Sequence, residues 1–256
     1  MARARRWRRW IRPTIPALFE ALLLVGIVAG PARAGYQATV DVNESAFQPP
    51  CIGFVDSYPS KMLKAAGAAY ARMGYVTGSF TTTNFTRAHT LARTVNDWGY
   101  YAHSHGDYYW HAGDQRRYTG YREDGGDCSQ PVIFSKDIAA KRAGRPSNLV
   151  FMSMCHNADS NTTMPGAFAI EKVKAVADGW NGPEFFVGYI GTAFDNDEWV
   201  FEVRYWDALA DGRSVGEAFD LAMLGSFTHS DFDANWWGTY RWSGFPGPLQ
   251  QCTRCL

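Results

Sequence analysis

Short apolar runs that stop abruptly at polar residues are the main pattern of this chain. Runs of this length, bounded by turn residues, are typical of buried β-strands. They predict strands over residues 75–80, 98–102, 149–154, 184–190 and 239–245. Residues 35–50 lack a clear period, and we expect them to be irregular or to form one short strand.

Helical periodicity fills the intervals between these runs. It predicts helices over residues 59–73, about 84–96, 136–143, from the segment after Cys155 to about 178, and as a pair after residue 195. The second helix of that pair begins with Ser214-x-x-Glu217, a capping box. Residues 107–131 are rich in Tyr, Gly, Arg and Asp, which indicates a hairpin or a long loop.

One helix has a face that the spacing defines. In the helix ending near Asn96, the predicted buried residues are Phe85, Ala88, Leu91, Ala92 and Val95. Strands that alternate with helices along the chain predict an α/β fold, with a mostly parallel central sheet flanked by helices.

The N-terminus has the three-part layout of a secretory signal. Residues 1–12 contain six arginines and no acid, an apolar stretch follows from Ile15 to Gly30 with only Glu20 interrupting it, and 31–34 read Pro-Ala-Arg-Ala. The apolar part is short for a membrane span, which needs about 20 residues. We therefore predict a signal peptide over 1–34 and one domain over 35–256, without a stable membrane anchor after cleavage and located outside the cell or in the periplasm.

The charge balance limits the partners. The whole chain carries 25 basic and 25 acidic residues, and removing 1–34 takes away seven Arg and one Glu, so the remainder has 18 − 24 = −6. A mildly acidic domain without a basic stripe argues against nucleic acid as a partner. The sequence does not indicate an oligomeric state.

All five cysteines lie in the predicted exported part, where disulfides are favoured. An odd number leaves at least one thiol unpaired. Cys155 ends the apolar run 149–154, a strand-like context, and we expect it to stay reduced. The other four stand among Pro, Gly or polar residues, and their three possible pairings stay open: Cys51, Cys128, Cys252 and Cys255.

A cysteine and a histidine occupy two predicted strand ends. His105-Gly106 follows the run 98–102, and Cys155 follows 149–154. Ligands of open α/β sheets bind at the carboxyl ends of the strands, so these residues are expected to form one site. A thiol beside an imidazole can attack a carbonyl carbon, and the backbone N–H groups of Gly106 and Cys155 can stabilise the resulting oxyanion. This chemistry requires no cofactor.

These residues resemble the anchors of the caspase-like cysteine peptidases, most closely the CHAT and gingipain-type branch. The resemblance covers roughly residues 50–247 in the right order, with further similar segments at 132–140, 187–197, 205–219 and 235–245. It implies a caspase-like sandwich and a secreted cysteine endopeptidase acting on a protein or peptide substrate. His105 would be the base, Cys155 the nucleophile, and Gly106 and Cys155 the oxyanion donors.

The chain also departs from the family pattern. His156 follows the cysteine where another polar residue is usual, and Phe194 stands in place of a tryptophan. Specificity in this fold usually comes from a pocket near the cysteine. Asp195, Asp197 and Glu198 follow a strand end and could bind a basic side chain before the scissile bond. The predicted substrate-binding residues are Asp195, Asp197 and Phe194. Acids at the start of a helix also suit the helix dipole, which is the alternative explanation.

Two other classes of function remain open at this stage. His103, His105 and Asp107 form His-x-His-x-Asp and would share one face of a strand, which suits a zinc-dependent hydrolase. A peptidase scaffold retained for binding is the other class. Its aromatic residues could form a carbohydrate platform, although packing into an edge strand is the simpler role: Trp236, Trp237, Tyr240 and Trp242.

Overall fold

The structure is a computed structural model that describes residues 36–80, 85–124, 128, 131–142, 147–160, 162–170 and 184–238. The predicted signal peptide over 1–34, the predicted strand over 239–245 and the candidates Cys252 and Cys255 lie outside these residues. The same holds for the last part of the helix expected to end near 178.

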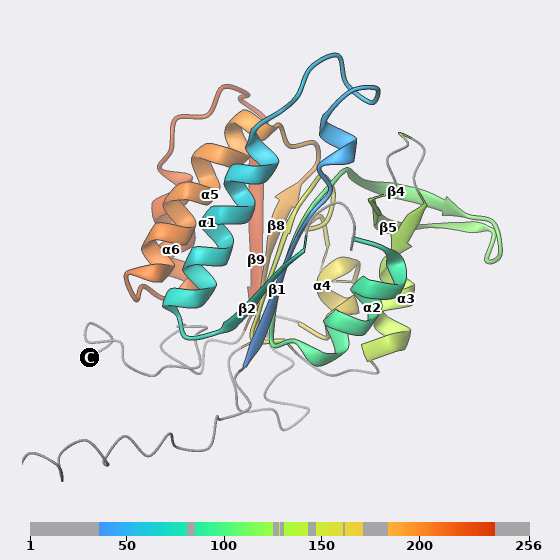
Figure 1. Ribbon diagram of the computed structural model, residues 1–256, viewed down its shortest axis with the longest axis horizontal. Coiled ribbons are helices and arrows are strands. Elements are labelled where there is room, and N and C mark those ends of the chain that lie inside the picture. The colour runs from blue at the N-terminus through green and yellow to red at the C-terminus, as the bar shows by residue number, and fades with distance from the viewer. Residues whose placement is uncertain are drawn as a thin grey trace, which may run out of the picture. The chain divides into compact units, whose positions relative to one another are not determined.

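A six-stranded sheet forms the centre of the molecule, in the order β2-β1-β3-β7-β8-β9 (Figure 1). Neighbouring strands run parallel except β9, which is antiparallel to β8. The strands are β1 (Gln37–Val42), β2 (Val76–Phe80), β3 (Gly99–His103), β7 (Leu149–Ser153), β8 (Phe185–Ile190) and β9 (Asp233–Gly238). The predicted α/β fold with a mostly parallel sheet is therefore confirmed.

The expectation for residues 35–50 was incomplete, because β1 is a buried inner strand between β2 and β3. Its apolar side chains Ala38, Val40 and Val42 are fully buried. The intervening polar residues are buried as well, since Thr39 bonds to Asp97 and Asp41 accepts the Tyr100 hydroxyl at 3.1 Å. Buried polar residues that have hydrogen-bond partners interrupt the apolar run, so hydrophobicity alone does not identify this central strand.

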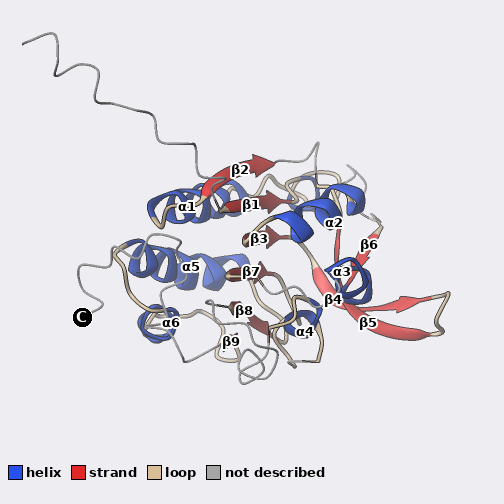
Figure 2. Ribbon diagram, turned by 90° about the horizontal axis from the view of Figure 1, so that it is seen from below, coloured by secondary structure: helices blue, strands red, loops and turns tan. Residues whose placement is uncertain are grey.

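Helices cover both faces of the sheet (Figure 2). One face carries α1 (Tyr58–Arg72), α5 (Asp195–Ala210) and α6 (Val215–Met223), and the other carries α2 (Arg87–Asn96), α3 (Ser135–Arg142) and α4 (Met164–Ala167). The capping box of α6 is present, with Ser214 and Glu217 bonding to each other's backbone N–H. Within the described residues, no helix has the length and apolar character needed to cross a membrane.

Alternating side chains of the strands divide between two cores. Tyr101 and Phe151 pack beneath α1 and α5, whereas Tyr100 and Val150 pack on the opposite face. The edge strand β9 follows the same rule: Trp236 packs against the first core and Trp237 belongs to the second. These two tryptophans therefore pack into the protein rather than forming an exposed carbohydrate platform.

The predicted buried face of α2 was partly right, because Phe85 is fully buried and Leu91 packs against the core, but it was wrong for the two alanines. The helix begins after the N-cap Thr86, and its buried residues are Thr90 and Thr94, while Ala88 and Ala92 are exposed. The Tyr100 hydroxyl lies 3.4 Å from the Thr90 hydroxyl in the core. A tyrosine hydroxyl beneath the helix makes a buried threonine suitable where the apolar pattern favoured alanine.

A small antiparallel sheet emerges between β3 and β7, formed by β4 (Gly106–His111), β5 (Arg116–Arg122) and β6 (Val132–Phe134). This is the hairpin expected within 107–131. A disulfide joins Cys51 to Cys128, one of the pairings that the sequence left open. Cys155 is free, as expected.

Candidate active site

The topology brings the two predicted strand ends side by side. β3 and β7 pair in parallel with His103 opposite Ser153, so His105 and Cys155 each follow two residues later. Both residues line one cavity of about 650 Å³. Its rim is formed partly by the segment before α1, where Phe54 and Val55 are exposed apolar residues. The expected pairing of His105 and Cys155 in one site therefore agrees with the geometry.

The thiol of Cys155 lies half-buried against the loop after β8. Its sulfur accepts the Ala193 N–H at 3.4 Å and lies 3.6 Å from the Ala193 carbonyl oxygen. Burial raises the pKa of Cys155 to about 11, and the nearby Glu198 and Asp195 carboxylates act in the same direction. The thiol is therefore protonated in the free site at neutral pH.

His105 is oriented by a backbone carbonyl. Its ring bonds to the backbone of Ala46 and lies tilted against Phe47, with ring centroids 4.6 Å apart. Although the residue is exposed on the whole, desolvation of the imidazole lowers its pKa, and Arg122 adds to this effect. A neutral imidazole fixed through one nitrogen leaves the other nitrogen able to accept a proton.

Gly106 is required by the close approach of the cysteine loop. A Cβ at this position would lie 2.4 Å from the Cys155 carbonyl oxygen and 2.6 Å from the Asn157 amide nitrogen. The Asn157 side chain donates to that carbonyl at 2.8 Å, which fixes the peptide after Cys155. In the described part of the chain, no backbone carbonyl accepts the Cys155 N–H.

His156 shapes the turn that presents Cys155. Its φ of 62° lies in the left-handed region, and its N–H donates to the Gly191 carbonyl at 2.8 Å. Asp159 holds both neighbours, since its carboxylate lies 2.9 Å from the His156 ring and accepts the Gly191 N–H at 2.8 Å. His156 thus belongs to a link between the loops that follow β7 and β8.

Three carboxyls form an acidic floor in the cavity that His105 and Cys155 line. Asp195 and Glu198 from α5, and Asp56 from the segment before α1, line the cavity. Burial raises the pKa of Asp195 to about 8, and a hydrogen bond to Asp56 contributes to the shift. Burial and the charges of Asp195 and Glu202 raise the pKa of Glu198 well above its ordinary value. The cavity wall also carries Lys61, whose ammonium lies over the Tyr58 ring, 5.2 Å from its centroid.

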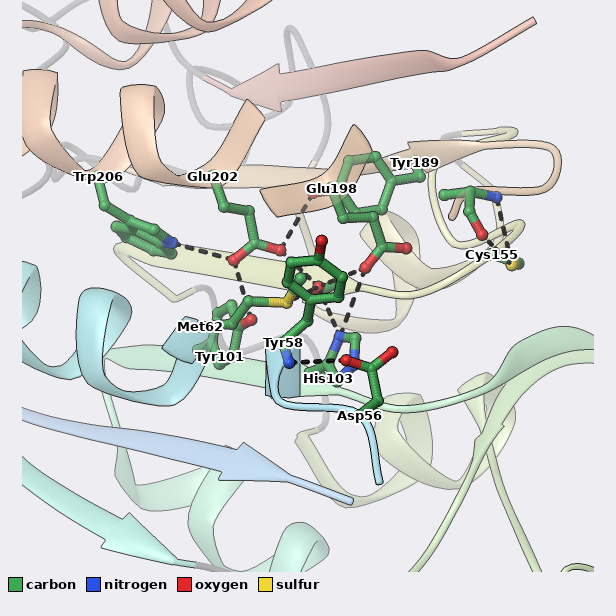
Figure 3. Close-up of polar contacts among 12 residues, drawn as sticks. Asp56, Tyr58, Met62, Tyr101, His103, Cys155, Tyr189, Glu198, Glu202 and Trp206 are labelled. Atoms are coloured by element: carbon green, nitrogen blue, oxygen red, sulfur yellow. Dashed lines mark hydrogen bonds and ion pairs between the residues drawn. The ribbon is translucent and has the colours of Figure 1, made fainter. Parts of the chain in front are cut away.

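Glu202 lies one turn beyond Glu198 and completes an acidic row on α5 formed by Asp195, Glu198 and Glu202. Both of its carboxylate oxygens accept hydrogen bonds from the protein (Figure 3). It accepts hydrogen bonds from the hydroxyls of Tyr101 at 2.9 Å and Tyr189 at 3.1 Å, from the Trp206 indole at 3.2 Å, and from Ser153. Burial nevertheless raises its pKa to about 7, against the effect of these donors. Glu202 therefore has a structural environment different from that of Asp195.

The predicted substrate-binding residues separate in the structure. Asp195 and Phe194 line the cavity, with Phe194 stacked on His229 at a centroid distance of 3.9 Å. Asp197 faces the loop of Thr228 and His229 instead, accepting both backbone N–H groups at 2.6 and 3.0 Å. Its expected role in the pocket is therefore corrected to anchoring this loop.

Sequence reasoning included Glu198 among the acids that could bind a basic side chain, and the structure places it in the cavity, but it missed Asp56 and Glu202. Asp195, Glu198 and Glu202 have the i, i+3, i+7 spacing that places side chains on one helix face. That spacing was the available signal. Asp56 carried none, because only the fold brings its segment beside α5.

The His-x-His-x-Asp ligand set is not brought together. The chain leaves β3 at His103 and enters β4 at Gly106, so these residues do not share one strand face as expected. Asp107 lies exposed on β4 and accepts the N–H of Tyr108. In the part of the chain that the structure describes, the group of potential metal-binding side chains that meet is a different one: His103, Asp195 and Glu198.

Comparison with known proteins adds little to this geometry. No protein-family model and no curated protein matches the chain. Among solved structures, the chain is similar to a crystal structure of protein GSU0716 from Geobacter sulfurreducens, with 12% sequence identity and a TM-score of 0.47. That similarity covers 79% of this chain and 92% of the other.

Proposed function

We propose that this protein is a cysteine endopeptidase of the caspase-like kind, with Cys155 as nucleophile and His105 as general base. The observation that carries the proposal is the placement of both residues after adjacent parallel strands, lining one cavity with an acidic floor. The arrangement is what the sequence resemblance implies, and the geometry supports it.

The reaction begins with a neutral pair. His105 accepts the thiol proton as the sulfur attacks the carbonyl carbon of the scissile bond, which forms a tetrahedral oxyanion. His105 then gives the proton to the leaving amine, and a thioester on Cys155 remains. Water, deprotonated by His105, attacks the thioester and releases the acid product with the thiol.

The proposed oxyanion donors are the backbone N–H groups of Cys155 and Gly106. The N–H of Cys155 lacks a backbone acceptor within the described residues, so it is available to a developing negative charge. The side chain of Asn157 fixes the Cys155 peptide through its carbonyl oxygen, which holds this donor in place. Gly106 allows the two segments to approach closely.

The proposed substrate preference is a basic side chain before the scissile bond. Asp195 and Glu198 present carboxyls to the cavity, and burial raises the pKa of each, so ionising them calls for a positive charge beside them. A guanidinium or an ammonium group would supply it. The nearby aromatic residue Phe194, 43% exposed, offers a surface for the methylene part of such a side chain.

The function also includes a proposed location. The arginine-rich and apolar segment over 1–34 supports export, and the Cys51–Cys128 disulfide is of the kind that persists in oxidising compartments. The substrate would then be an extracellular or periplasmic protein or peptide.

A matched pair of fluorogenic peptides tests the proposal. One peptide carries arginine before the scissile bond, and the other carries citrulline, which has a similar shape without the charge. We expect cleavage of the arginine peptide, and loss of cleavage in both Cys155→Ala and His105→Ala. Undiminished cleavage in Cys155→Ala would exclude the proposed nucleophile, and equal rates on the two peptides would exclude the acidic pocket.

A further inference from the structure

His103 is buried and lines the same cavity as His105 and Cys155. One of its ring nitrogens has no hydrogen-bond partner among the described residues. The residue is 1% exposed and stacks on Phe47 at a centroid distance of 4.6 Å. Its Nδ1 lies 2.9 Å from the Ser153 hydroxyl oxygen, whereas its buried Nε2 has no hydrogen-bond partner within the described residues. A buried polar atom without a partner is rare and calls for an explanation.

The hydrogen-bond network assigns the free lone pair. The Ser153 hydroxyl contacts Glu202 closely and lies 3.1 Å from a Glu198 carboxylate oxygen. We assign its one proton to the closer contact with Glu202, so Ser153 accepts from the Nδ1–H of His103. The Nε2 atom then carries an unprotonated lone pair. Burial lowers the pKa of His103 to about 3, which keeps the ring neutral.

Two carboxyls lie next to this imidazole. The Nδ1 atom of His103 lies 3.5 Å from a carboxylate oxygen of Glu198, and one ring nitrogen of His103 and one carboxylate oxygen each from Asp195 and Glu198 all lie within 4.8 Å of one another. Ligand atoms around one zinc ion lie roughly 3–4 Å apart, as bond lengths of about 2.0–2.2 Å require. Small side-chain movements, with the imidazole turned so that Nε2 faces the two carboxyls, would close this set around an ion.

We propose that His103, Asp195 and Glu198 form a binding site for a zinc ion at the floor of the cavity. Imidazole nitrogen with two carboxylate oxygens suits zinc, whereas calcium prefers six or more oxygen ligands. Two carboxylates balance the charge of the ion, and Asp56 adds a third acid nearby. Ser153 orients the imidazole through Nδ1, as a second-layer partner of a metal ligand does.

This site differs from the His-x-His-x-Asp arrangement, with which it shares only His103. It needs neither Cys155 nor His105. Its consequence for activity rests on the proposed function: zinc would occupy the carboxyls that receive the basic side chain. Zinc would then inhibit cleavage competitively with an arginine substrate.

Zinc binding to purified Cys155→Ala protein, followed by isothermal titration calorimetry, tests the site without any thiol ligand. We expect one ion per chain, with binding weakened by about 100-fold in Asp195→Asn and His103→Asn, at the upper end of losses seen for metal-site substitutions. His111→Asn is the matched control, because His111 lies 3.5 Å from Asp114 on the exposed hairpin. Its zinc binding should be unchanged.

The outcomes separate the two proposals. Absence of zinc binding, or binding unaffected by both Asp195→Asn and His103→Asn, would overturn the zinc site, whatever the peptidase assay shows. Circular dichroism of each variant establishes that it is folded, and Asp195→Asn at the partly exposed start of α5 keeps the test decisive if His103→Asn is unstable. Zinc binding that depends on Asp195 in a protein without peptidase activity would support the site and contradict the proposed function.

Discussion

Glu202 and Asp195, at the two ends of the acidic row on α5, differ in the number of hydrogen-bond donors that the protein provides. This difference separates a structural carboxylate from one that can bind a ligand. Glu202, at the deeper end, receives hydrogen bonds from two tyrosines, a tryptophan and a serine. Asp195, at the helix start, faces a cavity and another acid, Asp56. The same helix face therefore contains a carboxyl that the protein satisfies and a carboxyl that a positively charged ligand can satisfy.

The comparison also explains why the presence of several acids at the start of α5 did not show which of them line the pocket. Asp197 stands between Asp195 and Glu198 in the sequence, yet it accepts hydrogen bonds from the loop of Thr228 and His229. Position on the helix determines which acid reaches the cavity. We therefore propose a ligand-binding role for Asp195, which lines the cavity. Asp197 and Glu202, which accept hydrogen bonds from the protein, have a structural role.

The largest expected effect is a loss of folding stability on replacing Glu202, whose carboxylate accepts hydrogen bonds from four side chains. Glu202→Ala leaves the hydroxyls of Tyr101 and Tyr189 and the Trp206 indole buried without their acceptor, which costs about 3 kcal/mol or more. Urea unfolding measures this loss. Asp195→Ala is the matched variant, and it should change the unfolding free energy by less than about 1 kcal/mol, since it removes a carboxyl with a raised pKa. A larger loss in Asp195→Ala than in Glu202→Ala would reverse the comparison.

The next effect is on substrate preference, at the cavity end. Asp195→Asn keeps the shape of the side chain and removes its charge, so kcat/KM for the arginine peptide should fall by about 100-fold. The citrulline peptide should be cleaved at nearly the same rate by both enzymes. A similar fall for both peptides would indicate that Asp195 supports the fold of the site rather than the charge of the substrate.

A smaller effect is expected from pH. A bound cation favours the ionised form of Asp195, whose pKa in the free site is raised to about 8. Binding of a cation is therefore weaker below pH 8, where Asp195 must first lose its proton, and stronger above it. Affinity of agmatine for Cys155→Ala should rise by about tenfold between pH 7 and pH 9. Calorimetry at these two pH values measures the change, and Asp195→Asn, which cannot titrate at this position, should lose most of it.

The smallest effect on specificity is predicted at Asp197. Asp197→Asn weakens the hydrogen bonds to Thr228 and His229 and should lower stability by about 1 kcal/mol. The ratio of arginine to citrulline cleavage should change by less than about threefold, because Asp197 is bonded to the loop of Thr228 and His229 and does not line the cavity. A loss of preference as large as that of Asp195→Asn would place both acids in the pocket.

Much of the fold was predictable because the strong local signals agree with the tertiary structure. The apolar runs ending at residues 102 and 154 became the adjacent strands β3 and β7, and the capping box placed the start of α6. β1 and the buried threonines of α2 were missed for one shared reason. Their buried polar residues, Asp41 and Thr90, pair with Tyr100 from another strand, and the sequence does not show that pairing.

The candidate site divides in the same way. His105, Gly106 and Cys155 could be selected because each stands at a strand end, which is a local feature. Asp56 comes from a segment far from α5 in sequence, and its contact with Asp195 depends on the tertiary fold. The expected His-x-His-x-Asp set failed because a change of strand between His103 and Gly106 is not visible as a change in polarity.

Covalent labelling of Cys155 is the most direct test of the account. A peptide acyloxymethyl ketone ending in arginine reacts with a cysteine only when its side chain is bound and the thiol is activated, and mass spectrometry identifies the labelled residue. We predict labelling at Cys155, much slower reaction of the citrulline counterpart, and loss of labelling in His105→Ala. Labelling at another residue would contradict Cys155 as the nucleophile. Equal rates for the arginine and citrulline reagents would contradict a binding role for the acids that line the cavity.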